Sequence, residues 1–370
     1  MKSEEIKFPF YAKITIFIIG LIGLLAILYI AQSIIVPLVF AVIIAVLLSP
    51  VVNFLVQKRI NRIVSIVIAL LLTFIFIAGF GVLLFSQASR FTESWPQLVE
   101  KFTEIFNDGI IWASGYLDID PEKIHLWIIK SQGEIVNKST AAVGQIILGI
   151  GTFVMIAFLV PLYIFLILYY RPILHDFIHR LFKEDHQSQV SEVVTQIKNV
   201  IQRYLIGLIA ETGIVAALQI TTLFALGIEY AILLGIIGAL LNLIPYIGGL
   251  VAVALPMIVA LATKTSAWYA IYVLVIYYII QLIDNNYIVP YIVASKVKIN
   301  ALFSIIVVFV GNALWGIPGM FLSIPLLAII KLIFDHVESL KPWGFVLGDT
   351  MPQILKIEPI LKKLKSIQPS

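Results

Sequence analysis

Long stretches without a single Asp, Glu, Lys or Arg are the feature that most limits how this chain can fold. A helix needs only about 20 apolar residues to cross the hydrocarbon core of a bilayer. Soluble domains carry about 25% charged residues, whereas this chain has 12% charged and 61% hydrophobic residues. We therefore predict an all-α, polytopic integral membrane protein whose apolar surface is covered by the lipid bilayer. The uncharged stretches are 14–57, 63–89, 139–170, 230–263, 265–283 and 299–330.

The apolar stretches divide into about eight hydrophobic segments. The first stretch is too long for one helix and breaks most naturally at Gln32–Ser33. Between the third and fourth spans, Trp95–Pro96 is expected to start a short helix that ends at Asp108–Gly109. Apolar residues at three- and four-residue intervals over 190–204 predict an amphipathic helix that leads directly into the fifth span, near 205–227.

Lys and Arg in the short connections set the orientation, because cytoplasmic loops carry an excess of them. With three spans before residue 87 and a fourth after residue 140, the basic connections all fall on one side. That side is the cytoplasm, where we expect both termini, while the acidic region 87–140 lies outside.

Two of the apolar stretches, 230–263 and 299–330, are too long for one span and too short for two. Each contains a central run of glycine and proline. Pro245 and Pro318 both follow a glycine by seven residues, so the two breaks resemble degenerate copies of one element, although coincidence remains the alternative. The residues that shape these breaks are Pro245, Gly248 and Gly249 in the first stretch, Gly316, Pro318 and Gly319 in the second, and Pro290 in the segment between them.

A broken helix at membrane depth leaves backbone groups unpaired, which is tolerated only against protein or a water-filled cavity. Secondary transporters place substrates and coupling ions beside such half-helix ends, in inverted repeats. If both stretches are re-entrant hairpins, Lys296 and Lys298 lie in the cytoplasm and obey the positive-inside rule; if both are full spans, these lysines lie outside. We favour hairpins that enter from opposite faces as an inverted repeat.

These features predict six regions along the chain. They are N-terminal spans 1–3 in 1–86, a small extracytoplasmic helical region at 87–140, span 4 at 141–170, a cytoplasmic amphipathic helical region at 171–204, a transport core with broken helices at 205–335, and a cytoplasmic tail at 336–370.

Few polar residues lie inside the apolar segments, and these are the candidates for a solute or ion pathway. Glu211 is an acid within an apolar span, where an ionisable side chain is costly and marks function by default; the alternative is a shallow residue that pairs with Arg203. Asp284, Asn285 and Asn286 offer oxygen ligands to a cation or a polyhydroxylated solute, or they cap a helix end.

Asn242 and Asn312 precede the two breaks at matching places, where they bind substrate or satisfy freed backbone groups. His175 and His179 share the spacing of some zinc ligands, but no third ligand accompanies them, so no metal site is expected.

Three motif runs and one shorter match resemble the autoinducer-2 exporter family over essentially the whole chain. The resemblance implies a bacterial multi-pass transporter of the cytoplasmic membrane, with members assigned to signal export or to sodium/proton exchange, and with oligomeric assembly. This chain has Ile299-Asn300-Ala301 where members have Leu-His-Pro, and Tyr291 where members have Arg, so no role of that His or Arg carries over. The matching residues are Leu243-Ile-Pro245-Tyr-Ile-Gly248-Gly249, Asp284-Asn285-Asn286-Tyr-Ile-Val-Pro290, Trp315-Gly316-Ile-Pro318-Gly319-Met320 with Pro325, and Tyr204-Leu-Ile-Gly207.

The leading functional hypothesis is a secondary-active transporter that exports a small solute or signalling molecule, such as autoinducer-2, driven by a proton or sodium gradient. A sodium/proton antiporter, an oligomeric channel and a non-transporting scaffold are the alternatives. No phosphate-binding Gly-x-x-x-x-Gly-Lys-Ser/Thr motif occurs, and no catalytic constellation is present, so neither an enzyme nor a cofactor is expected. The partners we expect are the lipid bilayer, a small-molecule or ion substrate and further copies of the chain, and not nucleic acid.

Overall fold

The computed structural model describes residues 9–117, 157–182, 184–244, 248–293 and 299–349, and every regular element in these ranges is a helix. Seven helices among them are long and apolar enough to cross a membrane. The prediction of an all-α, polytopic membrane protein is therefore confirmed. These seven are α1 (Phe10–Ile30), α2 (Gln32–Gln57), α3 (Arg62–Leu117, apolar as far as Glu93), a helix over Ala157–Arg180, α5 (Gln187–Ala225), α8 (Trp268–Ile283) continued by the π-helix η2 (Asp284–Val293), and α9 (Ala301–His336).

The shorter elements are α6 (Ala231–Asn242), α7 (Gly248–Thr263), α10 (Lys341–Leu347) and the 3₁₀ turns η1 (Glu184–His186) and η4 (Glu338–Leu340).

Helices α1 and α2 are separated at Ala31, within one residue of the expected break. No side chain of α1 is buried, as expected for a helix that faces lipid. Helices α2 and α3 pack with the helix Ala157–Arg180 around buried Ala41, Ile66 and Ile164.

The helix expected to start at Trp95 is not a separate element, because α3 continues without a break from Arg62 to Leu117. The predicted start and end of that helix are therefore wrong. A single proline removes one backbone hydrogen bond, and here the flanking residues keep the helix going on both sides. The helix Ala157–Arg180 likewise continues past Pro172, while residues 141–156 of the expected fourth span lie outside the described residues. The amphipathic 190–204 segment is one helix with the fifth span, as predicted.

The first broken stretch is a helical hairpin, made of α6 and α7. At its open end, Ala231 of α6 and Ala262 of α7 share one buried cluster. At its closed end, Gly248 donates a backbone hydrogen bond to the Ile244 carbonyl, 3.0 Å away. With a rise of about 1.5 Å per residue, neither arm is long enough to span a hydrocarbon core of about 30 Å.

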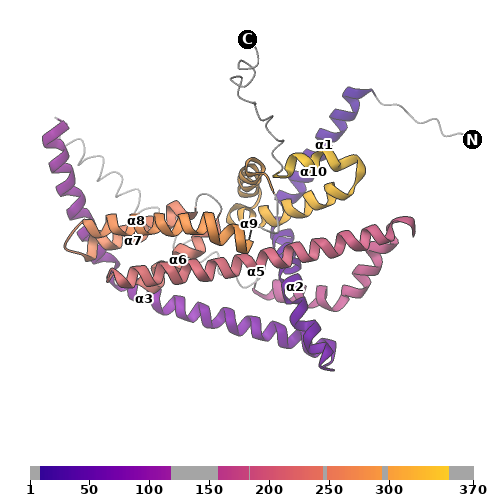
Figure 1. The fold of residues 1–370 in the computed structure, drawn as a ribbon, viewed down its shortest axis with the longest axis horizontal. Coiled ribbons are helices and arrows are strands. Elements are labelled where there is room, and N and C mark those ends of the chain that lie inside the picture. The colour runs from indigo at the N-terminus through magenta and orange to yellow at the C-terminus, as the bar shows by residue number, and fades with distance from the viewer. Residues whose placement is uncertain (1–8, 118–156, 183, 245–247, 294–298, 350–370) are drawn as a thin grey trace, which may run out of the picture.

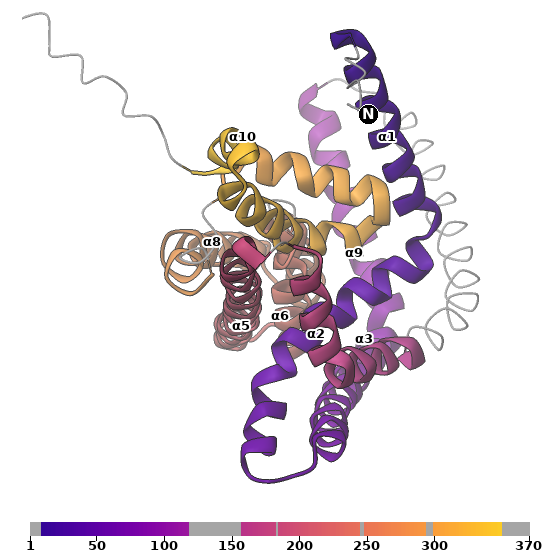
Figure 2. The ribbon, with the colours of Figure 1, turned by 90° about the vertical axis from the view of Figure 1, so that its right-hand side faces the viewer.

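The second broken stretch, α9, is also a hairpin, because Gly316 takes φ 64° and ψ −142° and reverses the chain. The two arms, 301–315 and 317–336, then lie side by side (Figure 2). The Ser323 hydroxyl on the second arm lies 2.9 Å from the Val307 carbonyl on the first. A side chain on Gly319 would collide with the carbonyl oxygen of Gly311, so the glycine pair permits this close approach.

The two hairpins approach from opposite ends of α5. Leu223, near the C-terminal end of α5, packs on the open end of the α6–α7 hairpin. Gln189, near its N-terminal end, donates a hydrogen bond to the His336 carbonyl at the open end of the α9 hairpin. In Figure 1, α6 and α7 accordingly lie along the left part of α5, and α9 lies further to the right.

Helix α8 with η2 runs antiparallel to α5. Ala270 and Val273 at the start of α8 share a cluster with Leu223, whereas Val293 at the end of η2 packs on Tyr204. Each half of this core is thus a long helix followed by a hairpin, and the two halves point in opposite directions. The arrangement agrees with the predicted inverted repeat. Apart from α9, the described part of the chain holds six candidate spans, the number expected if two of the eight hydrophobic segments are hairpins.

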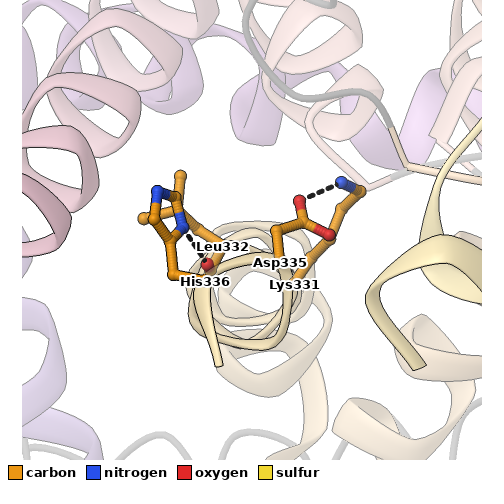
Figure 3. A network of polar contacts seen from close by, with 4 residues as sticks. All are labelled: Lys331, Leu332, Asp335 and His336. Atoms are coloured by element: carbon orange, nitrogen blue, oxygen red, sulfur yellow. Dashed lines mark hydrogen bonds and ion pairs between the residues drawn. The ribbon is translucent and has the colours of Figure 1, made fainter. Parts of the chain in front are cut away.

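The open end of the α9 hairpin carries its own polar contacts, drawn in Figure 3. Lys331 and Asp335 form an ion pair one helical turn apart, and the His336 ring donates to the Leu332 carbonyl, 2.8 Å away. The Asn300 backbone N–H donates to the Leu347 carbonyl of α10 at 2.9 Å. The first two contacts lie within α9, and the third ties the start of the hairpin to α10, which follows it.

Candidate functional site

One face of α5 supplies the first wall of a central cavity. Tyr204, Leu208 and Glu211 follow one another at spacings of four and three residues, so they lie on the same side of the helix, and all three line the cavity. Glu211 is only 7% exposed. The predicted intramembrane acid is therefore buried in the protein and not displayed to lipid.

Asp284 lines the same cavity from the junction of α8 and the π-helix η2. It is 1% exposed, and its Oδ2 accepts a 2.8 Å hydrogen bond from Asn242 Nδ2 at the end of α6. The wide turns of η2 also contain Pro290, whose missing N–H and bulky ring are poorly tolerated in a regular α-helix. A π-helical turn inside a longer helix frequently marks a functional site.

The cavity measures about 640 Å³ and is bordered by both repeats. The α6–α7 hairpin contributes Asn242 and Gly249, α9 contributes Ser304 and Ile324, and the long helices supply the carboxyl groups. Glu211 and Asp284 are near enough to interact electrostatically. The complete lining is Tyr204, Leu208, Glu211, Asn242, Leu243, Gly249, Val253, Leu274, Tyr277, Tyr278, Gln281, Asp284, Asn285, Val289, Val293, Ile299, Ala301, Ser304 and Ile324.

Two buried polar atoms in this lining have no hydrogen-bond partner among the described residues. They are Oδ1 of Asp284 and the hydroxyl of Tyr277, which is 6% exposed. Buried polar groups are nearly always hydrogen-bonded, because an unmade bond costs about 1–3 kcal/mol. The cavity therefore presents free polar atoms that water, an ion or a solute would satisfy.

Of the predicted pathway residues, Glu211, Asn242, Asp284 and Asn285 meet at the cavity. Asn286 does not: it is exposed and its amide donates to the Leu282 carbonyl at 2.8 Å. Its hydrogen bond lies within its own continuous helix, which runs on to Val293. Asn312 is exposed as well and is absent from the lining of either described cavity.

The glycines of the first break permit close contacts. A side chain on Gly248 would collide with the Leu241 carbonyl, and one on Gly249 would lie 2.5 Å from Oε1 of Gln281. Pro245 lies outside the described residues. In the second break, Gly316 holds the chain reversal, and Pro318 lies beside it at the tip.

Sequence reasoning missed the aromatic part of the site. Tyr277 and Tyr278 line the cavity from α8, and Gln281 lies one turn further on. The only signal in the sequence was a Tyr-Tyr pair about two turns before Asp284 within an apolar segment, which is equally typical of a membrane-interface position.

A second cavity of about 440 Å³ lies where the two hairpin tips meet. Leu240, Leu241 and Ile244 border it from the first hairpin, and Ile317 and Pro318 border it from the second. All its lining residues are apolar. The tips of the two opposed hairpins therefore border the same apolar cavity.

Two antiparallel repeats, each a long helix followed by a hairpin, surround a cavity that holds two acids. This is the architecture of membrane transporters built from inverted repeats. Residues 17–339 match the family model described as AI-2E family transporter. Because the match covers most of the chain, this protein belongs to that transporter family, as the motifs indicated.

The relatives are distant but similar in length. YrrI of Bacillus subtilis (strain 168) is 22% identical, over 84% of this chain and 88% of its own length. YueF of the same organism is 22% identical, over 82% of this chain and 84% of its own length. The AI-2 transport protein TqsA of Escherichia coli (strain K12) is 24% identical, over 91% of this chain and 96% of its own length.

Proposed function

We propose that this protein is a secondary-active transporter that exports a small solute through the cavity between the two opposed hairpins, driven by a proton or sodium gradient. The observation that supports this proposal is the meeting of Glu211 and Asp284, one from each repeat, in a cavity bordered by both hairpins. Acids in membrane segments are rare and commonly form ion pathways and proton relays.

The coupling follows from the proximity of the two acids. Two ionised carboxylates that share a buried site repel each other, and a proton or cation between them relieves the repulsion. A solute that enters the same cavity competes with that proton or cation, or is carried with it. Movement of the paired hairpins past one another would then expose the cavity to either side of the membrane in turn.

Autoinducer-2 is one candidate substrate, because the relative TqsA is named an AI-2 transport protein. Sodium/proton antiport is the second candidate function, and the pair of carboxylates favours it. In both cases we place the protein in a bacterial cytoplasmic membrane as a homo-oligomer, with both termini in the cytoplasm. The basic residues of the short connections support that orientation.

Flux measurements in proteoliposomes test the proposal. Purified protein is reconstituted, and the flux of autoinducer-2 and of sodium is followed with and without an imposed proton gradient. We expect gradient-dependent flux that falls at least about tenfold in Asp284→Asn, which keeps an acceptor for Asn242 but loses the charge. Glu229→Gln, an acid-to-amide change at an exposed position away from the cavity, is the matched control. Equal flux with and without the gradient would contradict the coupling.

A further inference from the structure

We propose that the central cavity binds an organic cation with an apolar, aromatic-sized body, so that lipophilic cations form a further substrate class of this transporter. The inference rests on the proposed function, because it assigns chemistry to the same site. Three independent features of the lining support it: its charge, its free polar and aromatic groups, and its size.

The charge of the lining is one-sided. Glu211 and Asp284 both border the cavity, and none of its described lining residues is Lys, Arg or His. Neither acid forms an ion pair within the described part of the chain. A buried charge is costly unless it is paired, and a cationic ligand in the cavity would supply such a pairing charge.

The free polar atoms and the tyrosines point to where such a cation would lie. Oδ1 of Asp284 and the hydroxyl of Tyr277 are buried without a partner. Tyr204 and Tyr278 border the same space. Aromatic faces attract organic cations and form the cages that recognise quaternary ammonium groups. Carboxylates together with three phenol rings therefore suit a bulky cation better than a small, strongly hydrated one.

The size and the apolar walls of the cavity leave room for an organic cation beside the carboxyl groups. A space of about 640 Å³ lies within the range of about 300–1,000 Å³ that is typical of pockets for drug-sized ligands. Leu208, Leu243, Val253, Leu274 and Val289 line much of it. A sodium ion gains nothing from these apolar walls, whereas the hydrocarbon part of an organic cation is removed from water by them.

Binding of tetraphenylphosphonium tests the inference, with tetraphenylborate as an anion of the same shape. Saturable binding of each ion to purified protein in detergent is measured by equilibrium dialysis, with protein-free micelles subtracted. We expect saturable binding of the phosphonium and no saturable binding of the borate. The phosphonium affinity should fall at least about tenfold in Glu211→Gln and in Asp284→Asn, and several-fold in Tyr278→Ala.

Glu229→Gln is the control, because it removes one negative charge outside the cavity and should leave the affinity unchanged. Equal binding of phosphonium and borate would overturn the inference, since apolar walls alone would then explain binding. Phosphonium binding that survives both acid substitutions, in variants that elute as folded protein, would overturn it as well.

The same variants separate this inference from the proposed function. Absence of phosphonium binding together with gradient-driven solute flux that depends on Asp284 would refute the substrate class and leave the transporter intact. Charge-selective phosphonium binding without any gradient-driven flux would support the cation site and contradict the transport proposal.

Discussion

Replacement of Gly207 by alanine should push apart the two helices that carry the acids. In the native structure, a β-carbon at this position would lie 2.5 Å from the carbonyl oxygen of Ile292 and 3.3 Å from the Cα of Val293. Ordinary van der Waals contact begins at about 3.4 Å, so roughly 0.9 Å of overlap must be relieved by moving the η2 backbone. Overpacking of this kind costs about 1–3 kcal/mol.

Thermal unfolding of purified protein in detergent measures this cost. At roughly 2 °C per kcal/mol, the low end of the range for larger domains, Gly207→Ala should lower Tm by about 2–6 °C. Gly213 is the matched control, because it lies on the same helix and a β-carbon there would meet nothing within 4 Å. Gly213→Ala should stabilise the helix by up to about 1 kcal/mol. Equal Tm changes in the two variants would refute the close helix crossing.

Three further substitutions probe the α9 hairpin. Gly316→Ala should cost about 1–3 kcal/mol, because its φ of 64° with ψ of −142° suits only glycine; a Tm equal to that of the wild type would contradict the chain reversal. Trp315→Phe removes the 2.9 Å hydrogen bond from the indole to the Leu28 carbonyl of α1, so amide exchange at the end of α1 should accelerate, and unchanged exchange would show that this bond does not hold α1. Ser323→Ala deletes the 2.9 Å contact with Val307 and should cost about 0.5–1.5 kcal/mol in chemical unfolding; a cost near zero would mean that the glycine contacts alone join the arms.

The membrane architecture was readable from the sequence because its signals are local. The length of a charge-free stretch predicts whether it can span the membrane. Glycine and proline predict a helix break, because their backbone conformations differ from those of other residues. The two hairpins followed from stretches too long for one span and too short for two, together with the turn residues at their centres. The tight contact between Gly311 and Gly319 was not readable, since only the folded arms bring these residues together.

The site was partly predictable for the same reason. Glu211 and Asp284 stand out because acids are rare in apolar segments, and the structure places both on one cavity. The tyrosines of α8 carry no comparable signal, because aromatic residues are common along membrane helices. Asn312 matched Asn242 by its position before a break, yet its side chain is exposed. The similarity of the two broken stretches therefore predicted the positions of the breaks correctly. It did not predict which of the two asparagines lines the cavity.

The sequence prediction was wrong where a helix continues past a proline. Pro96 was expected to mark the start of a helix, but it lies within the continuous helix α3. Proline weakens one turn locally, whereas the surrounding residues on both sides retain helical hydrogen bonds. The boundary expected near residue 87 therefore does not coincide with a break in α3.

Transport through the central cavity, as proposed, requires the two hairpins to enter the membrane from opposite faces. The chain contains no cysteine, so single cysteines can be introduced at Thr265, between α7 and α8, and at Ser339, after α9; both side chains are exposed. Each variant is labelled with a membrane-impermeant maleimide in right-side-out and in inverted vesicles. We expect Thr265→Cys to react only in right-side-out vesicles and Ser339→Cys only in inverted ones. Labelling of both positions from the same side would contradict this expectation.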